Sequence, residues 1–116
     1  QIQHALNLSP SALPYAWRHV PGKNDHGEGA QIDLLFDRDD DAITICEIKY
    51  SNKKFKLDKQ TVKKLLLRKE IFVKQTKTNK QIFIVMITSD GLANNFYADD
   101  IINGEITLDD LFLKDK

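Results

Sequence analysis

Apolar and polar residues alternate along two neighbouring segments, residues 31–37 and 43–50, with a polar stretch at 38–41 between them. A period of two predicts β-strands, and a short polar turn between two strands predicts an antiparallel hairpin. Successive side chains of a strand point to opposite faces. The first strand is expected to place Ile32, Leu34 and Phe36 on one face and Asp33 and Leu35 on the other. The second is expected to place Ile43, Ile45, Glu47 and Lys49 on one face.

The rest of the pattern predicts one long helix and a buried strand. The helix is expected to begin at Asp58, a residue type that caps helix N-termini, and to end near Lys74. Its apolar stripe is expected to consist of Val62, Leu65, Leu66, Phe72 and Val73. Residues 82–88 form a continuous apolar run, which is typical of a strand buried on both faces. Because this strand and the one at 43–50 flank the helix, we expect them to run parallel with a right-handed crossover.

Shorter segments complete the predicted domain: a helix end at residues 1–8, a strand at 15–20, a loop at 21–29 and a short helix from Thr107. Together these elements predict a single α/β domain over residues 1–116, with a central mixed sheet. The length and the hydrophobic content of 41% suit one modest core. Because the first residue is Gln1 and not Met, we expect the chain to be a fragment of a longer protein.

The composition also indicates a cellular compartment. No apolar run approaches the ~20 residues that span a bilayer, so no membrane association is expected. The single cysteine, Cys46, excludes an internal disulfide framework and fits a reducing, cytoplasmic compartment.

Charge is distributed unevenly along the chain, although the formal net charge is zero. Between Lys53 and Lys80 there are eleven Lys or Arg and two acids, a net charge of +9, so the rest of the chain carries −9. A basic segment near acidic residues suits a phosphodiester enzyme, because cations attract the nucleic-acid backbone. A solvated helix face would explain the same composition. The candidate nucleic-acid contacts are Lys53, Lys54, Lys63, Lys64 and Arg68.

Two carboxylates and a lysine are expected to meet on the predicted hairpin. If the turn is centred on Asp40, Asp33 lies directly opposite Glu47, with Cβ atoms about 4.5–5.5 Å apart. Like charges at that separation are destabilising, and a divalent cation would remove the conflict. Mg²⁺, or Mn²⁺ in its place, suits such a site because Mg²⁺ takes carboxylate, water and phosphate oxygens as ligands. Lys49 would then position or activate the attacking water, or stabilise the developing negative charge.

The spacing leaves a second interpretation open, in which Asp33, Lys49 and Glu47 form a cross-strand salt-bridge cluster on a solvated sheet face. The register decides between them, because a slip of one residue would move one carboxylate to the other face.

Two more residues are candidates for the site. Gln31, opposite Lys49 in this register, would contact substrate or form a surface hydrogen bond. Glu28, in the preceding glycine-rich loop, would approach the metal or remain solvated.

The residues of the hairpin also resemble a known family. The sequence GAQIDLL at 29–35, followed by ICEIKYS at 45–51, resembles the PD-(D/E)xK, or restriction-endonuclease-like, superfamily. More narrowly, it is similar to the C-terminal domain of a group of prokaryotic AAA-type ATPases, with the signature G-x-x-I-D … E-x-K-[YWF]-S. Similarity extends to residues 55–59, 87–92 and 106–112, and so covers most of the chain.

This resemblance implies a three-layer fold, with a central mixed sheet flanked by helices. It implies that Asp33 and Glu47 are metal ligands, that Lys49 is the catalytic lysine, and that the domain hydrolyses DNA phosphodiester bonds with Mg²⁺ beside a parent ATPase domain. Members often add an acid from the first helix. Residues 1–8 contain no Asp or Glu, so we expect that acid upstream of Gln1.

The resemblance also leaves non-enzymatic functions open. No glycine-rich phosphate loop is present, so ATP is expected to bind only to the parent domain. Superfamily members that have lost activity serve as binding or assembly modules. The alternatives are therefore an inactive nuclease-like module that binds nucleic acid or protein, and a regulatory docking domain.

Overall fold

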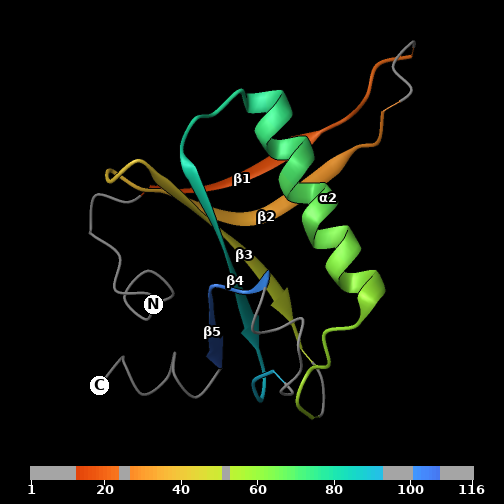
Figure 1. Ribbon diagram of the computed structural model, residues 1–116, viewed down its shortest axis with the longest axis vertical. Helices are drawn as coiled ribbons and strands as arrows, with labels where there is room; N and C mark the ends of the chain where they lie inside the picture. The colour runs from red at the N-terminus through yellow and green to blue at the C-terminus, as the bar shows by residue number, and fades with distance from the viewer. Residues whose placement is uncertain (1–12, 24–26, 51–52, 93–100, 108–116) are drawn as a thin grey trace.

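A five-stranded mixed sheet with one helix packed against it forms the domain in the computed structural model, which describes residues 13–23, 27–50, 53–92 and 101–107 (Figure 1). Its elements are β1 (Leu13–His19), β2 (Ala30–Asp37), β3 (Ala42–Lys49), α2 (Lys59–Thr76), β4 (Gln81–Thr88) and β5 (Gly104–Thr107). The strands lie in the order β1-β2-β3-β4-β5. β2 is antiparallel to both of its neighbours, whereas β3, β4 and β5 run parallel. The predicted α/β class, mixed sheet and parallel β3–β4 pair are confirmed.

Helix α2 crosses one face of the sheet (Figure 1). The predicted cap is confirmed, because the Asp58 carboxylate accepts a hydrogen bond from the Thr61 backbone N–H at 2.8 Å. Val62, Leu65 and Phe72 are the buried residues of the helix. Leu66 is 41% exposed, so its predicted place in the buried stripe is wrong. Leu66 is four residues after Val62, but it projects about 100° around the helix from Leu65 and therefore lies at the edge of the face that Val62, Leu65 and Phe72 bury.

The second helical layer expected from the resemblance is not part of the described structure. The helix expected at residues 1–8 lies outside the described residues, as does the segment 108–116. Thr107, which was expected to open the last helix, is the final residue of β5. No helix in the described ranges combines the length and the apolar character needed to cross a bilayer.

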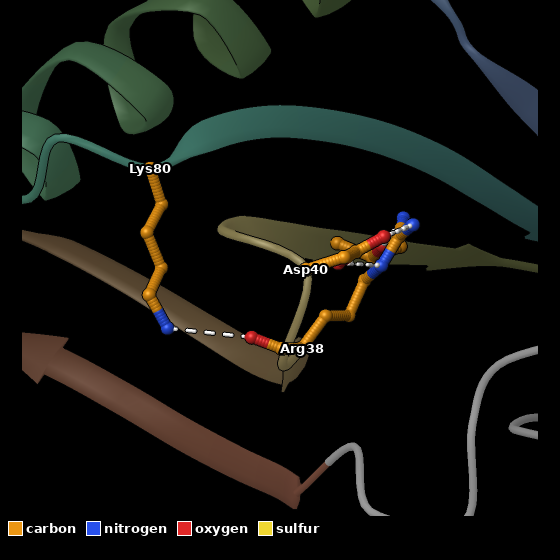
Figure 2. A network of polar contacts seen from close by, with 4 residues as sticks. Arg38, Asp40 and Lys80 are labelled. Atoms are coloured by element: carbon orange, nitrogen blue, oxygen red, sulfur yellow. Dashed lines mark hydrogen bonds and ion pairs between the residues drawn. The ribbon is translucent and has the colours of Figure 1, made fainter.

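The β2–β3 turn is held by a network of polar contacts at residues 38–41, where the turn was predicted. The Arg38 backbone N–H donates to the Ala42 carbonyl at 3.0 Å, and Asp41 adopts a left-handed φ of 59°. Figure 2 shows the Arg38 guanidinium against the Asp40 carboxylate and Lys80 reaching the Arg38 carbonyl from the start of β4. The hydrogen bond from Arg38 lowers the pKa of Asp40.

This turn sets the register of β2 against β3. Their described pairs run from Leu34↔Cys46 to Asp37↔Ile43, which is the register predicted for a turn centred on Asp40. Against β1, however, β2 carries one extra residue. Tyr15 pairs with Leu35 but Trp17 pairs with Ile32, so two β1 positions span three on β2. β2 therefore contains a β-bulge at residues 33–34.

The bulge changes which way the first half of β2 faces. Ile32 is buried with Leu35 and with Phe72 of α2, whereas Leu34 packs against the cluster on the opposite face of the sheet, with Phe36. The predicted shared face for Ile32, Leu34 and Phe36 is therefore wrong for Ile32. An extra residue moves every preceding side chain to the other face.

The core lies on both faces of the sheet. Under α2, the buried side chains come from β2, β3 and the helix, with Met86 of β4 contacting the start of the helix. The other face buries Phe36, Cys46, Val85, Ile87 and Ile106. Burial raises the pKa of the Cys46 thiol to about 12, as expected for a small core residue. Strand β4 is buried from Ile84 to Thr88, which confirms the interpretation of its apolar run.

Candidate functional site around Glu47

Glu47 is a nearly buried carboxylate held between two cations. The residue is only 9% exposed and lies on β3, under α2. One carboxylate oxygen, Oε2, pairs with the Arg68 guanidinium, and the other, Oε1, lies 3.5 Å from the Lys49 ammonium. Arg68 comes from α2, so this contact joins the helix to the sheet. A buried charge is costly unless it is paired, and these cations supply the pairing.

The local sequence explains how these three side chains converge. Glu47 and Lys49 are two residues apart on one strand and therefore point to the same face. Arg68 lies three residues after Leu65, whose side chain is buried against the sheet, so it shares that helix face. Sequence reasoning assigned Arg68 to nucleic-acid binding and missed its contact with Glu47. The spacing from Leu65 indicates that Arg68 faces the sheet, but it does not specify Glu47 as its partner.

Asp33 lies at the bulge rather than in a regular ladder. It is exposed, and its Oδ1 accepts a hydrogen bond from the Gln31 side-chain amide at 2.8 Å. The described β2–β3 pairs end at Leu34↔Cys46, one position before Asp33 and Glu47, and Asp33 has no partner in the described β1–β2 pairs. The predicted pairs of Asp33 with Glu47 and of Gln31 with Lys49 stay predictions. The Lys49–Glu47 ion pair is the part of the alternative salt-bridge cluster that the structure contains.

A cavity of about 260 Å³ adjoins this cluster. It lies between the start of β2 and α2, and its lining includes Glu28, Gln31, Lys64 and Arg68. Four of the ten residues proposed from the sequence therefore surround one space. Lys64 and Arg68 are four residues apart and so lie on neighbouring turns of one helix face. Lys53, Lys54 and Lys63 are exposed and do not line this cavity.

Asp33 and Glu47 are the two carboxylates that the sequence predicts as metal ligands. Asp33 and Glu47 offer carboxylate oxygens, which Mg²⁺ prefers, with water and phosphate completing its coordination. Within the described ranges, no group of three or more His, Cys, Asp or Glu residues could hold a metal ion. Both oxygens of Glu47 already contact cationic side chains. A metal ion at Glu47 would therefore compete directly with Arg68.

The fold and the site define an α/β domain with a paired, nearly buried carboxylate beside a basic helix. Comparison of the chain with protein-family models, with curated proteins and with solved structures finds no match. The function is therefore argued from the geometry of the site and from the residue pattern of the hairpin.

Proposed function

We propose that this chain is a restriction-endonuclease-like domain that hydrolyses DNA phosphodiester bonds with the help of Mg²⁺. The observation that carries the proposal is Glu47, a carboxylate kept at 9% exposure with Lys49 beside it and a basic cavity next to it. The E-x-K spacing on β3 supplies an acid and a cation on one face. The basic residues of α2 supply contacts for the phosphate backbone.

In this proposal Glu47 and Asp33 hold the metal ion, and Gln31 orients Asp33 through their hydrogen bond. Mg²⁺ bound there would lower the pKa of a coordinated water and offset charge on the phosphate. Lys49 positions the attacking water or stabilises the charge that develops on the phosphate oxygens. Arg68 pairs with Glu47 in the free protein and would contact the substrate phosphate if a metal ion were held at Glu47.

The burial of Glu47 supports a functional role for this residue. Taking an ion pair out of water costs several kcal/mol per ion before the pairing offsets that cost. Proteins in which a buried ion pair is replaced by apolar residues of similar volume are often as stable as the original, or about 1–4 kcal/mol more stable. The adjoining strand position is occupied by Met86, which is fully buried. An acid among such neighbours is hard to explain by stability alone.

Attachment to a parent ATPase belongs to the same proposal and rests on the sequence resemblance. ATP would then bind to the parent domain and act on this domain through changes in their relative arrangement. The proposed location is the cytoplasm of a prokaryotic cell.

A nicking and linearisation assay on supercoiled plasmid DNA, with a longer chain that includes the first helix and its expected acid, tests the proposal. Wild type is expected to cut with Mg²⁺ or Mn²⁺ and to stop when EDTA is added. Lys49→Ala and Glu47→Gln are expected to abolish cutting. Lys74→Ala is the matched control, because Lys74 is an exposed lysine on the last turn of α2, outside the site. Equal inactivity of wild type and Lys49→Ala under all metal conditions would refute the enzymatic proposal.

One observation favours a second function, a nucleic-acid-binding module without catalysis. Arg68 already neutralises Glu47, and Asp33 is engaged by Gln31 at the bulge. Such a module would bind DNA without metal ions, and its affinity would fall steeply with salt. Binding would survive Asp33→Ala and Glu47→Ala and would be lost when Lys63, Lys64 and Arg68 are neutralised together. If wild type cleaves DNA and either Asp33→Ala or Glu47→Ala abolishes the cleavage, a module without catalysis is excluded.

A further inference from the structure

A second cavity, of about 370 Å³, lies at the C-terminal end of α2. Its lining comes from β1, β2, β3, the last turns of α2 and the segment before β4. Its lining includes Tyr15, Trp17, Leu35, Asp37, Phe72 and Lys80. We call it the aromatic groove. The proposed hydrolysis uses none of these residues, and the volume is within the usual range of small-molecule sites.

Three aromatic side chains give the groove its walls. Trp17 packs edge-to-face on Phe72 of α2, with ring centroids 5.1 Å apart and an interplanar angle of 82°. Tyr15 is two residues before Trp17 on β1, so both point to the same side of the sheet. Tyr15 is 47% exposed and lines the cavity. The groove therefore presents aromatic surface that the described residues leave uncovered.

A carboxylate and an ammonium stand together at one end of the groove. The Lys80 Nζ lies 2.5 Å from Asp37 Oδ1, and the two side chains are 34% and 39% exposed. The hydrogen bond to Asp37 raises the pKa of Lys80 above its ordinary value. A ligand at this end of the groove would meet one acceptor and one donor side by side.

We propose that the aromatic groove binds one unpaired nucleobase, stacked on the aromatic walls with its polar edge toward Asp37 and Lys80. Every base has a π-face that stacks on aromatic side chains, with little dependence on sequence. The edges of the bases carry neighbouring donors and acceptors, such as the amino group and ring nitrogen of adenine. This pattern matches an adjacent carboxylate and ammonium, which a purely apolar ligand would leave unused.

The choice of a nucleobase over other flat rings rests on the proposed function, which brings nucleic acid to this face. Arg68 and Thr76 are eight residues apart on α2, which corresponds to roughly 12 Å along the helix axis. Thr76 lines the groove and Arg68 lines the cavity of the candidate site. One strand could therefore contact both, with a base in the groove a few nucleotides from the reacting phosphate.

Trp17 makes the test direct, because it is the only tryptophan in the chain. Adenosine, guanosine, cytidine and thymidine are titrated into the protein while Trp17 fluorescence is followed. Saturable quenching is expected. Because stacking on one aromatic residue contributes about 1–3 kcal/mol, Tyr15→Ala should weaken binding by roughly 5- to 150-fold. Asp37→Asn and Lys80→Met should each weaken it and change the order of preference among the bases. Tyr50→Ala, at an exposed tyrosine outside the groove, should change nothing.

Two further arms decide the source and the chemistry of the ligand. A short single strand with a central abasic position should bind more weakly than the intact strand if the base comes from a strand. Equal affinities, with nucleosides still bound, would assign the groove to a free nucleoside. Indole, an apolar ring without the paired donor and acceptor, should bind more weakly than adenosine. Equal binding of indole and adenosine, unaffected by Asp37→Asn, would overturn base recognition.

The outcomes separate this inference from the proposed function. Absence of saturable quenching by any nucleoside or strand would refute the base site, even if plasmid cleavage occurs. Nucleoside binding that depends on Tyr15, in a protein that never cleaves DNA, would support the base site and refute the hydrolytic proposal. Circular dichroism and thermal unfolding of each variant establish that a loss of binding is not a loss of fold.

Discussion

Replacement of Arg68 tests whether the Glu47 ion pair is a buried, coupled interaction. Arg68→Met keeps an apolar stem on α2 and removes the guanidinium that pairs with Glu47. The carboxylate then stays nearly buried, with Lys49 at 3.5 Å as its remaining cation among the contacts described. Because its two oxygens no longer both have a cationic partner, the folded state loses stability.

The size of the effect follows from the burial of the three groups. Removing one partner of a fully buried pair costs about 3–5 kcal/mol. The Arg68 and Lys49 side chains are 27% and 43% exposed, so solvent and Lys49 compensate for part of the loss. We therefore expect the free energy of unfolding to fall by about 1–2 kcal/mol. The reduction should persist in high salt, because partly buried pairs are screened less than exposed ones.

Urea unfolding at neutral pH measures this change as a lower midpoint with an unchanged slope. Lys69→Met, at the next residue of the helix, is the matched control and should stay within about 0.5 kcal/mol of wild type. A double-mutant cycle with Glu47→Gln should give a coupling of about 1 kcal/mol between Glu47 and Arg68. The reasoning is refuted if Arg68→Met is as stable as Lys69→Met, or if the coupling is within error of zero.

Three further predictions concern the helix and the core. Leu65→Ala should lower the free energy of unfolding by about 2–5 kcal/mol, because Leu65 is buried. Leu66→Ala, at an exposed neighbour, should stay within about 0.5 kcal/mol of wild type. Equal losses would contradict the assignment of Leu65 to the buried face of α2. The hydrogen bond from the Thr61 backbone N–H lowers the pKa of Asp58. The stability that this bond adds is therefore present above the unfolded-state pKa and is lost as the pH falls through the lower folded-state pKa. Asp58→Ala should flatten that part of the curve of stability against pH, which urea midpoints measure. Because burial raises the pKa of Cys46 to about 12, a thiol reagent at pH 8 should react with it only as fast as the protein opens, and rapid reaction in native conditions would contradict its burial.

The sequence predicted those features of the fold that depend on local chemistry. The turn at residues 38–41 fixes a hairpin register, and the four described β2–β3 pairs follow it. Asp58 caps α2 because its side chain reaches a backbone N–H only three residues away. The apolar run of β4 indicated burial on both faces because no polar residue interrupts it. Each of these interpretations required only residues that are close together in the chain.

Features that depend on distant partners could not be predicted in the same way. The bulge in β2 arises from its pairing with β1; the consecutive apolar residues at 34–36 interrupt the alternation of residues 31–37 but do not by themselves specify a bulge. The Glu47–Arg68 contact requires that α2 cross β3 at one particular place, which the helix pattern alone does not specify. The aromatic groove likewise joins β1 to the far end of α2. The candidate residues were therefore identified individually, but their grouping came from the tertiary structure.

The bulge also has a consequence for the chain length that β2 needs. Ile32 is paired with Trp17 of β1, and Leu34 is paired with Cys46 of β3. These two pairings set which face of the sheet each side chain occupies. If Asp33 were deleted, regular alternation would put Ile32 and Leu35 on the same face, which is where the structure already buries them. The pleated sheet thus has no geometric requirement for this residue. β2 is one residue longer than its packing demands, and the surplus position carries a carboxylate.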